Sequence, residues 1–467
     1  MSGAAVGPGP GGGALVITGC AVATMDGART EYSEGHLVLR GGRIDAIGAG
    51  PAPGLDGEAT VVDGRGCLAT PGLVNTHHHL YQWASRGLAP DGTLFDWLTT
   101  SYPVWAGIDE DIVGAAAEAG LAWLALTGCS TTTDHHYVFP AGSGDLLGAE
   151  IAAAGRVGLR FHPTRGSMDL GRSAGGLPPD EVVEDIDTVL AATRRAIEQH
   201  HDPSPDSMLR IAVAPCSPFS ASTDLMAASA ELAREARVRL HTHLAETLDE
   251  EEFCAERFGC RPAEYMDRLG WLGPDVWFAH SVHLSDSDIA LLAGSGTGVA
   301  HCPSSNARLG AGIARTRALR DAGVPVGLGV DGAASNESCS LVEEVRHALL
   351  MARATGGPQA LAVRDALEMA TRGGAAVLGR SADIGSLEVG KQADVALWRL
   401  DGPGHAGIED PVAALVLGSA PPVALLTVRG QVVVRDARIT TVDPDAATAA
   451  GVQATRTLLA RAGLARS

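Results

Sequence analysis

The pattern of hydrophobic and polar residues divides the chain into two outer segments and a long middle segment. Near the start, the β-branched or alternating runs ALVITGCAVATM, HLVLRGGRIDAIG and ATVVDGRG are separated by glycines, and DVALWRL and PVALLTVRGQVVVRD form a similar group near the end. These runs predict strands joined by turns. In the middle segment, apolar runs alternate with stretches rich in Ala, Leu, Glu and Arg, which predicts parallel βα units.

The middle segment contains eight candidate strands. We expect them to end near His79, His136, Pro163, Cys216, His243, His280, His301 and Asp331. Eight βα units predict an α/β fold, a (β/α)8 barrel of the TIM type, whose active site lies at the carboxyl ends of the strands. Six of the eight predicted strands end on His or Asp, which is more than packing requires. The pattern therefore predicts a metal-dependent or catalytic site at the barrel mouth.

The two outer segments predict a second, smaller domain. We expect residues 13–69 and 381–445 to form a composite β-sandwich, residues 70–380 to form the catalytic barrel, and residues 446–467 to form a C-terminal helix. Residues 1–12 are mostly glycine, alanine and proline and are expected to form a disordered tail.

Composition narrows the class of partner and the compartment. A chain of 467 residues with 45% hydrophobic content can bury a large core. The formal net charge of −20 argues against a nucleic acid or an anionic membrane as partner, and favours a small molecule as substrate. The eight cysteines form no CxxC pair, and neither a signal peptide nor a long apolar run is found, so we expect a cytoplasmic protein with reduced thiols.

The stretch TPGLVNTHHHLYQ, residues 70–82, places three adjacent histidines after an apolar run. Successive side chains of a strand point to opposite faces, so His77 and His79 share one face while His78 points away. Two of the three imidazoles could therefore bind one metal ion. A histidine tract alone is a weak metal signal, and the other strand ends carry the argument.

The chain contains a single lysine, Lys391, in the segment GKQAD. Schiff-base chemistry, a GK[ST] phosphate site and a lysine-bridged metal pair are therefore excluded unless Lys391 itself serves.

Several motifs, in this order, resemble one known family. They are PGLVNTHHH, HTHLAE, FAHSVHLS, HCPSSNARLGAGIA, GVDGAASNESCSL and GSLEVGKQADVALW. The chain is thereby identified as similar to the amidohydrolase superfamily, and within it to the cytosine deaminase and chlorohydrolase branch. The resemblance covers nearly the whole chain and implies a metal-dependent barrel enzyme.

The resemblance implies a metal site formed by His77, His79, His243 and Asp331. Imidazole nitrogens with one carboxylate suit Zn²⁺ or Fe²⁺, and Zn²⁺ is the preferred assignment. His241 is an alternative to His243, because the two lie on the same face of one strand. Some members hold two metals bridged by a lysine on the fourth strand. Here that strand, RIAVAPC, has no lysine, so one divalent metal per chain is expected.

The resemblance also implies the catalytic groups. Asp331 is expected to act as ligand and proton acceptor, Glu246 to carry a proton to a ring nitrogen, and His280 to hydrogen-bond the attacking water or the tetrahedral intermediate. The implied reaction is hydrolytic loss of ammonia from an amidine-like ring carbon.

Departures from the family pattern bear on the substrate. Nucleoside deaminases of the branch keep a Glu and a His for the sugar at the positions where Trp105 and Cys216 stand, which predicts a free base as substrate. HHHLYQ, LFDWL, TTTDHHYVFP and TRGSMDLG are most similar to deaminases of 8-oxoguanine, whose relatives accept isocytosine. They are also close to ethylaminohydrolases of hydroxylated s-triazines, which remain the alternative. Gln82, His136 and Arg165 follow the first three strands and are predicted to contact the ring.

A non-catalytic metal-binding barrel is the alternative of another class. A degenerate family member is expected to lack a ligand or the proton carrier, but all six residues with these roles are present. The resemblance further implies a homo-oligomer, although no segment of the sequence identifies an interface.

Overall fold

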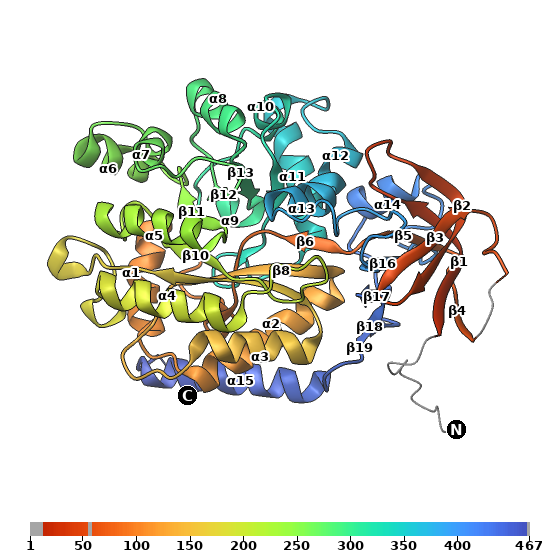
Figure 1. Cartoon of the computed structure of the whole chain (residues 1–467), viewed down its shortest axis with the longest axis horizontal. Helices are drawn as coiled ribbons and strands as arrows, with labels where there is room; N and C mark the ends of the chain where they lie inside the picture. The colour runs from red at the N-terminus through yellow and green to blue at the C-terminus, as the bar shows by residue number, and fades with distance from the viewer. Residues whose placement is uncertain (1–12, 55–57, 465–467) are drawn as a thin grey trace.

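The structure of the chain, a computed structural model, describes residues 13–54 and 58–464 (Figure 1). The tail expected over residues 1–12 lies outside the described residues. All eight cysteines are free and buried. Within the described ranges, no helix is both long and apolar enough to cross a membrane.

Eight parallel strands close into a barrel, which confirms the predicted fold class. Their order around the barrel is β10-β11-β12-β13-β14-β6-β8-β9. The bounds of these strands are β6 Leu73–Asn75, β8 Cys129–His136, β9 Arg160–Ser167, β10 Ala212–Pro215, β11 Leu240–Leu244, β12 Val276–His280, β13 Gly298–His301 and β14 Val326–Leu328.

Two of the predicted strand ends lie beyond the barrel strands that lead to them. β6 ends at Asn75 and β14 ends at Leu328, so His79 and Asp331 lie in two short extensions, β7 (His78–His79) and β15 (Asp331–Gly332). β7 and β15 pair in parallel, with Asp331 opposite His78. This pairing brings two segments that are far apart in sequence together at the barrel mouth.

Helices surround the barrel, as Figure 1 shows. The α-helices are α1 Leu94–Trp105, α2 Glu110–Leu126, α3 Leu146–Val157, α4 Ile186–His200, α5 Thr223–Ala236, α6 Leu248–Phe258, α7 Pro262–Arg268, α8 Asp286–Ser295, α9 Pro303–Arg308, α10 Thr316–Asp321, α11 Leu341–Gly356, α12 Val363–Glu368, α13 Gly374–Val377, α14 Pro411–Leu417 and α15 Pro444–Arg461. Short helical turns are η1 Leu80–Ser85, η2 Arg172–Ala174, η3 Asp180–Val182 and the π-helical η4 Met369–Gly373.

The two outer segments form one sheet beside the barrel (Figure 1). Its strands are β1 Ala14–Ala23, β2 Glu31–Arg40, β3 Arg43–Ala49, β4 Ala59–Asp63, β5 Cys67–Pro71, β16 Val395–Arg399, β17 Val423–Val428, β18 Gln431–Arg435 and β19 Arg438–Ile439. β5 joins the halves, because it pairs with β1 on one edge and with β16 on the other.

Buried polar contacts connect the sheet to the barrel. The buried guanidinium of Arg160 on β9 lies 3.2 Å from both carboxylate oxygens of Asp394. The barrel is therefore held in a fixed place against the sheet, and its mouth is left to the loops that follow the strands.

Candidate metal centre and pocket

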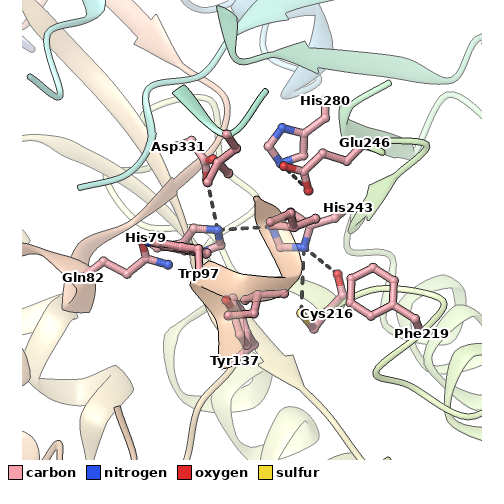
Figure 2. A pocket seen from close by; sticks show the side chains of 13 residues that line it. His79, Gln82, Trp97, Tyr137, Cys216, Phe219, His243, Glu246, His280 and Asp331 are labelled. Carbon is pink, nitrogen blue, oxygen red and sulfur yellow. Dashed lines mark hydrogen bonds and ion pairs between the residues drawn. The ribbon is translucent and has the colours of Figure 1, made fainter. Parts of the chain in front are cut away.

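Three histidines and one aspartate converge at the barrel mouth. His79 Nε2 lies 3.1 Å from His243 Nε2 and 3.2 Å from Asp331 Oδ1 (Figure 2). His77 Nε2 also lies 3.2 Å from Asp331 Oδ1. All four side chains are almost fully buried. The sequence-predicted ligands are therefore brought together, and His78 points away and bonds the main-chain oxygen of Asp331.

The hydrogen bonds of His79 and His243 fix which ring nitrogen carries the proton. His79 Nδ1 lies 2.7 Å from the carbonyl oxygen of His135, and His243 Nδ1 lies 2.6 Å from that of Cys216. A carbonyl oxygen only accepts, so both Nδ1 atoms must donate. In the neutral rings, the Nε2 lone pairs of His79 and His243 are therefore left facing each other and Asp331.

His77 also carries its proton on Nδ1, because it donates a hydrogen bond to His241. The Nδ1 atom of His241 lies 3.0 Å from the carbonyl oxygen of Trp277 and must donate, so the neutral ring accepts at Nε2. His77 Nδ1 lies 2.8 Å from that Nε2 and donates to it. The Nε2 lone pair of His77 then faces the centre, where it has no hydrogen-bond partner among the described residues.

The donor set fits a divalent metal ion. Three imidazole lone pairs and a carboxylate oxygen lie close together without a proton between them, which is unfavourable unless a cation binds there. Each ring is oriented by a partner at its other nitrogen, the usual arrangement behind metal-binding histidines. Ser335 Oγ donates to Asp331 Oδ2 at 3.0 Å, which leaves Oδ1 for the centre.

His135 lies at the same centre and was not predicted there. Its ring stacks on that of His243 with centroids 4.8 Å apart, and its Nε2 lies 3.0 Å from the carbonyl oxygen of Ala214. Among the described residues, three buried groups have a geometry that could hold a metal, and two of them lie at this centre. These two are His77, His79, His135 and His243, and His77, His243, His280 and Asp331. The third, Asp134, His136 and Glu150, lies behind β8, and His241 belongs to none of the three.

Glu246 and His280 form the wall beside these histidines (Figure 2). Glu246 Oε2 lies 3.6 Å from His280 Nε2. Burial, with the nearby charge of Asp331, raises the pKa of Glu246 well above its usual value. Asn306 Oδ1 lies 2.8 Å from His280 Nδ1 and accepts a hydrogen bond from its N–H. His280 Nε2 is thereby left directed at Glu246. The pair can therefore hold and move a proton at the edge of the pocket.

The main chain that carries Glu246 is held by a second carboxylate. Glu250, which is fully buried at the start of α6, accepts from the N–H groups of Ala245 at 2.8 Å and of Glu246 at 3.0 Å. Ala245 has a left-handed backbone with φ of 51°, which costs an L-residue roughly 1–3 kcal/mol. Glu250 thus stabilises a turn that the backbone alone disfavours, and it fixes the direction of the Glu246 side chain.

The pocket in front of the centre has one polar and one apolar side. It encloses about 360 Å³, including space that is open to solvent. The polar side is formed by His79, Glu246, His280 and Asp331 together with Gln82. The apolar and aromatic side was not predicted residue by residue; it consists of Leu94, Trp97, Leu98, Tyr137, Phe219 and Leu309.

Two of the five predicted substrate contacts line this pocket. The amide oxygen and nitrogen of Gln82 are both buried without a partner among the described residues. Cys216 lies beside His243, and burial raises the pKa of its thiol to about 12. Burial therefore favours the neutral thiol of Cys216, and Cys216 belongs to none of the candidate metal-binding groups among the described residues.

The structure places the other three predicted contacts outside the pocket lining. The Trp105 indole donates to Ser85 Oγ at 2.9 Å and packs edge-on against neighbouring aromatic rings. His136 points away from the barrel axis and lies 2.8 Å from Glu150. Arg165 pairs with Glu184 at 2.8 Å, so its charge is already balanced. Each of these three side chains therefore contacts other protein groups and does not line the pocket.

Comparison with known proteins assigns the family. Residues 68–434 match the family model described as "Amidohydrolase family". An 8-oxoguanine deaminase of Pseudomonas aeruginosa is 47% identical over 83% of this chain and 86% of its own length. A hydroxydechloroatrazine ethylaminohydrolase of Pseudomonas sp. (strain ADP) is 40% identical over 88% of this chain and 89% of its own.

A solved structure agrees with these sequence relatives. The crystal structure of atrazine chlorohydrolase from Arthrobacter aurescens TC1, complexed with zinc, superposes with a TM-score of 0.89 at 35% identity. The match covers 94% of this chain and all of that chain. The chain belongs to the amidohydrolase family, a family of metal-dependent enzymes. The expectation of an enzyme of this family, made from the sequence, is confirmed.

Proposed function

We propose that the chain is a mononuclear, zinc-dependent deaminase of a free oxidised purine or pyrimidine base, with 8-oxoguanine as its first substrate candidate. The observation that carries the proposal is the placement of Glu246 and His280 in the lining of the same pocket as His79 and His243, whose lone pairs converge. The 47% identity to an 8-oxoguanine deaminase supports the choice of base.

In this proposal His77, His79, His243 and Asp331 hold the metal. A bound divalent ion lowers the pKa of its water to about 7, and so supplies a nucleophile at neutral pH. The remaining steps belong to the protein. Asp331 accepts the proton of the attacking water, and Glu246, whose pKa is raised by burial, delivers a proton to the ring nitrogen beside the reacting carbon. His280 Nε2 holds the hydroxyl that has been added to that carbon.

The reaction balances as addition and elimination. Water adds across the C=N bond of the amidine and the C–NH2 bond breaks. The amino group leaves as ammonia with the proton that Asp331 accepted, and the added hydroxyl returns its proton to Glu246 as it becomes the ring carbonyl. From 8-oxoguanine, water gives urate and ammonia. Gln82, whose amide offers one acceptor and two donors, is suited to the adjacent C=O and N–H groups of such a ring.

The residues at the family's two sugar-binding positions support a free base over a nucleoside. Trp105 fills the position of the family's sugar-binding Glu with an indole that is fully buried. Cys216, at the position of the second sugar contact, offers only a neutral thiol. Trp97 and Phe219 supply flat apolar faces instead, which suit a planar heterocycle.

Ammonia release from a panel of substrates tests the proposal with the zinc-loaded protein. We expect 8-oxoguanine or isocytosine to exceed adenosine, guanosine and S-adenosylhomocysteine in kcat/KM by about a hundredfold or more, because two lost polar partners cost roughly 1–3 kcal/mol each. Comparable turnover of a nucleoside contradicts the sugar-site argument. Elemental analysis should find about one zinc per chain, and two tightly bound ions contradict the mononuclear site.

A second candidate keeps the mechanism and changes the substrate. The 40% identity to a hydroxydechloroatrazine ethylaminohydrolase favours a hydroxylated s-triazine, from which an alkylamine leaves in place of ammonia. Activity confined to N-alkylated hydroxytriazines in the same panel would select this candidate.

A further inference from the structure

Strand β8 presents two different sets of side chains to its two sides. His135 faces the metal centre, where its ring lies 4.8 Å from His243. Asp134 and His136 face the other way, towards Glu150 on α3. Asp134, His136 and Glu150 are all 0% exposed and form a compact group whose ligand atoms lie within 4.8 Å of one another. The catalytic scheme above uses none of the three.

The polarity of the His136 hydrogen bonds locates the first proton. His136 Nε2 lies 2.9 Å from the carbonyl oxygen of Val138, so Nε2 carries a hydrogen. His136 Nδ1 lies 2.8 Å from Glu150 Oε1. A proton must lie between these two atoms. Burial lowers the pKa of His136 to about 4 and raises that of Glu150 to about 8, so the proton belongs to Glu150.

The other end of the group requires a second proton. Asp134 Oδ1 accepts from the Leu80 N–H at 2.6 Å. Asp134 Oδ2 and Glu150 Oε2 are both buried and have no donor among the described residues. One oxygen of each carboxyl group lies within 4.8 Å of the other, so a proton on one of them can join the pair. Burial, with the charge of Glu150, raises the pKa of Asp134 well above its usual value.

Among the described residues, no unpaired cationic side chain lies close enough to balance two buried carboxylates. Arg165, which lies near His136, is paired with Glu184 at 2.8 Å. An uncompensated buried charge costs far more than a neutral hydrogen bond. A chain with two protons satisfies every acceptor and carries no net charge.

We propose that Asp134, Glu150 and His136 form a neutral hydrogen-bonded chain that positions η1, and that these residues act as positioning residues for the pocket. The chain runs from the Leu80 N–H to Asp134, from Asp134 to Glu150, from Glu150 to His136, and ends at the carbonyl oxygen of Val138. The proposal rests on the proposed function, because η1 carries Gln82 and begins directly after the metal-binding His79.

The position of the chain explains its effect on the pocket. Asp134 holds the Leu80 N–H, and the next residue of β8 accepts from His79 Nδ1 at 2.7 Å through its carbonyl oxygen. The His136 ring lies 4.9 Å from that of Tyr81 in η1. Three consecutive residues of β8 therefore fix the segment from His79 to Tyr81, and His136 contributes from within the wall and not as a substrate contact.

Amide substitutions test the neutral state. In Glu150→Gln the amide N–H donates to His136 and the amide oxygen accepts from Asp134, and in Asp134→Asn the amide oxygen accepts from Leu80 while its N–H donates to Glu150. We expect both variants, and the double variant, to keep the zinc dissociation constant, KM and kcat within about threefold of the wild type. If either amide variant loses zinc affinity or activity tenfold or more, the group is ionic or binds a metal, and the proposal is wrong.

An apolar variant tests the positioning role. Glu150→Met keeps most of the volume and removes both hydrogen bonds. We expect zinc binding to weaken about 10–100-fold, as for other groups behind metal ligands, together with a rise in KM. Unchanged zinc affinity and KM in a folded Glu150→Met protein would overturn the positioning role. If Glu150→Met does not fold, the two amide variants, Glu150→Gln and Asp134→Asn, still test the proposal, because only a neutral chain tolerates both amides.

The zinc measurement needs no substrate. If no base in the panel is deaminated while the amide variants keep their zinc affinity and Glu150→Met loses it, the proposed function fails and the hydrogen-bonded chain stands. If deamination is observed and the amide variants are inactive, the chain fails and the proposed function stands.

Discussion

Two clusters of the same residue types lie on opposite sides of β8. The first contains His77, His79, His243 and Asp331 and opens onto the pocket. The second contains Asp134, His136 and Glu150 and is closed. In the first, partners at Nδ1 turn the Nε2 lone pairs towards one another with no proton between them. In the second, each pair of facing atoms has a place for a proton. Hydrogen-bond polarity, more than residue composition, separates the candidate metal site from the group for which we propose a neutral, supporting role.

The largest effect is expected from removing an imidazole of the open cluster. His243→Ala should abolish tight zinc binding and lower kcat/KM by about 10⁴-fold or more, since members of one catalytic unit fail together. Elemental analysis and ammonia release measure the two losses. A His243→Ala protein that keeps stoichiometric zinc would assign the ligand elsewhere, with His135 as the first candidate.

Substitution of the proton carrier should separate activity from metal binding. Glu246→Gln is expected to retain one zinc per chain and to lose about 10²–10⁴-fold in kcat, the usual worth of a general acid or base. The measurement is kcat alongside zinc content of the same preparation. Loss of the metal would show that Glu246 is a ligand, contrary to its assigned role.

Substitution of His241 tests whether this residue binds the metal or only orients the ring of His77. In His241→Phe the ring can still stack on Trp277, whose centroid lies 4.4 Å away, but the acceptor for His77 Nδ1 is lost. Zinc affinity should fall about 10–100-fold, without the complete loss expected at His243. Zinc competition titrations of both variants decide between them. Equal losses at the two positions would reopen His241 as a ligand.

The smallest effect is expected at Glu250, which acts through the backbone. In Glu250→Gln, one of the two oxygens that accept from the N–H groups of Ala245 and Glu246 is replaced by an amide NH2. An NH2 group can only donate, so one buried N–H loses its acceptor, which costs roughly 1–3 kcal/mol. We expect kcat to fall about tenfold, the kinetic equivalent of 1.4 kcal/mol, with zinc content and KM unchanged. Glu252→Gln, an exposed neighbour on the same helix, is the matched control and should have no effect. A full rate in Glu250→Gln would remove its positioning role.

The barrel could be predicted from the sequence because each strand is a short apolar run between helical stretches. The alternation also placed His77 and His79 on one side, as the structure shows. The choice between His135 and His136 could not be made in this way. Both lie at the end of β8, and the period of two does not say which parity faces the axis until the strand is paired with its neighbours.

The apolar side of the pocket depends on α1, a helix, to which the period of two does not apply. Trp97 and Trp105 both lie on α1, with their rings 5.2 Å apart, but only Trp97 reaches the pocket. Its indole N–H donates to the carbonyl oxygen of Ala334 at 3.0 Å, which ties α1 to the loop after Asp331. This contact spans 237 positions, and nothing local in the sequence indicates it.

The pairing of β5 with β16 has a consequence for biosynthesis. Thr70 in β5 and Trp398 in β16 are in contact although they lie 328 positions apart. At about 5–20 residues per second, a ribosome needs on the order of tens of seconds to make the intervening chain. During that time β5, which is fully buried in the finished sheet, has no partner on one edge. Contacts so distant in sequence also form slowly. Soluble yield should therefore improve when fewer chains are synthesised at the same time, because the unpaired nascent edge then meets fewer other chains.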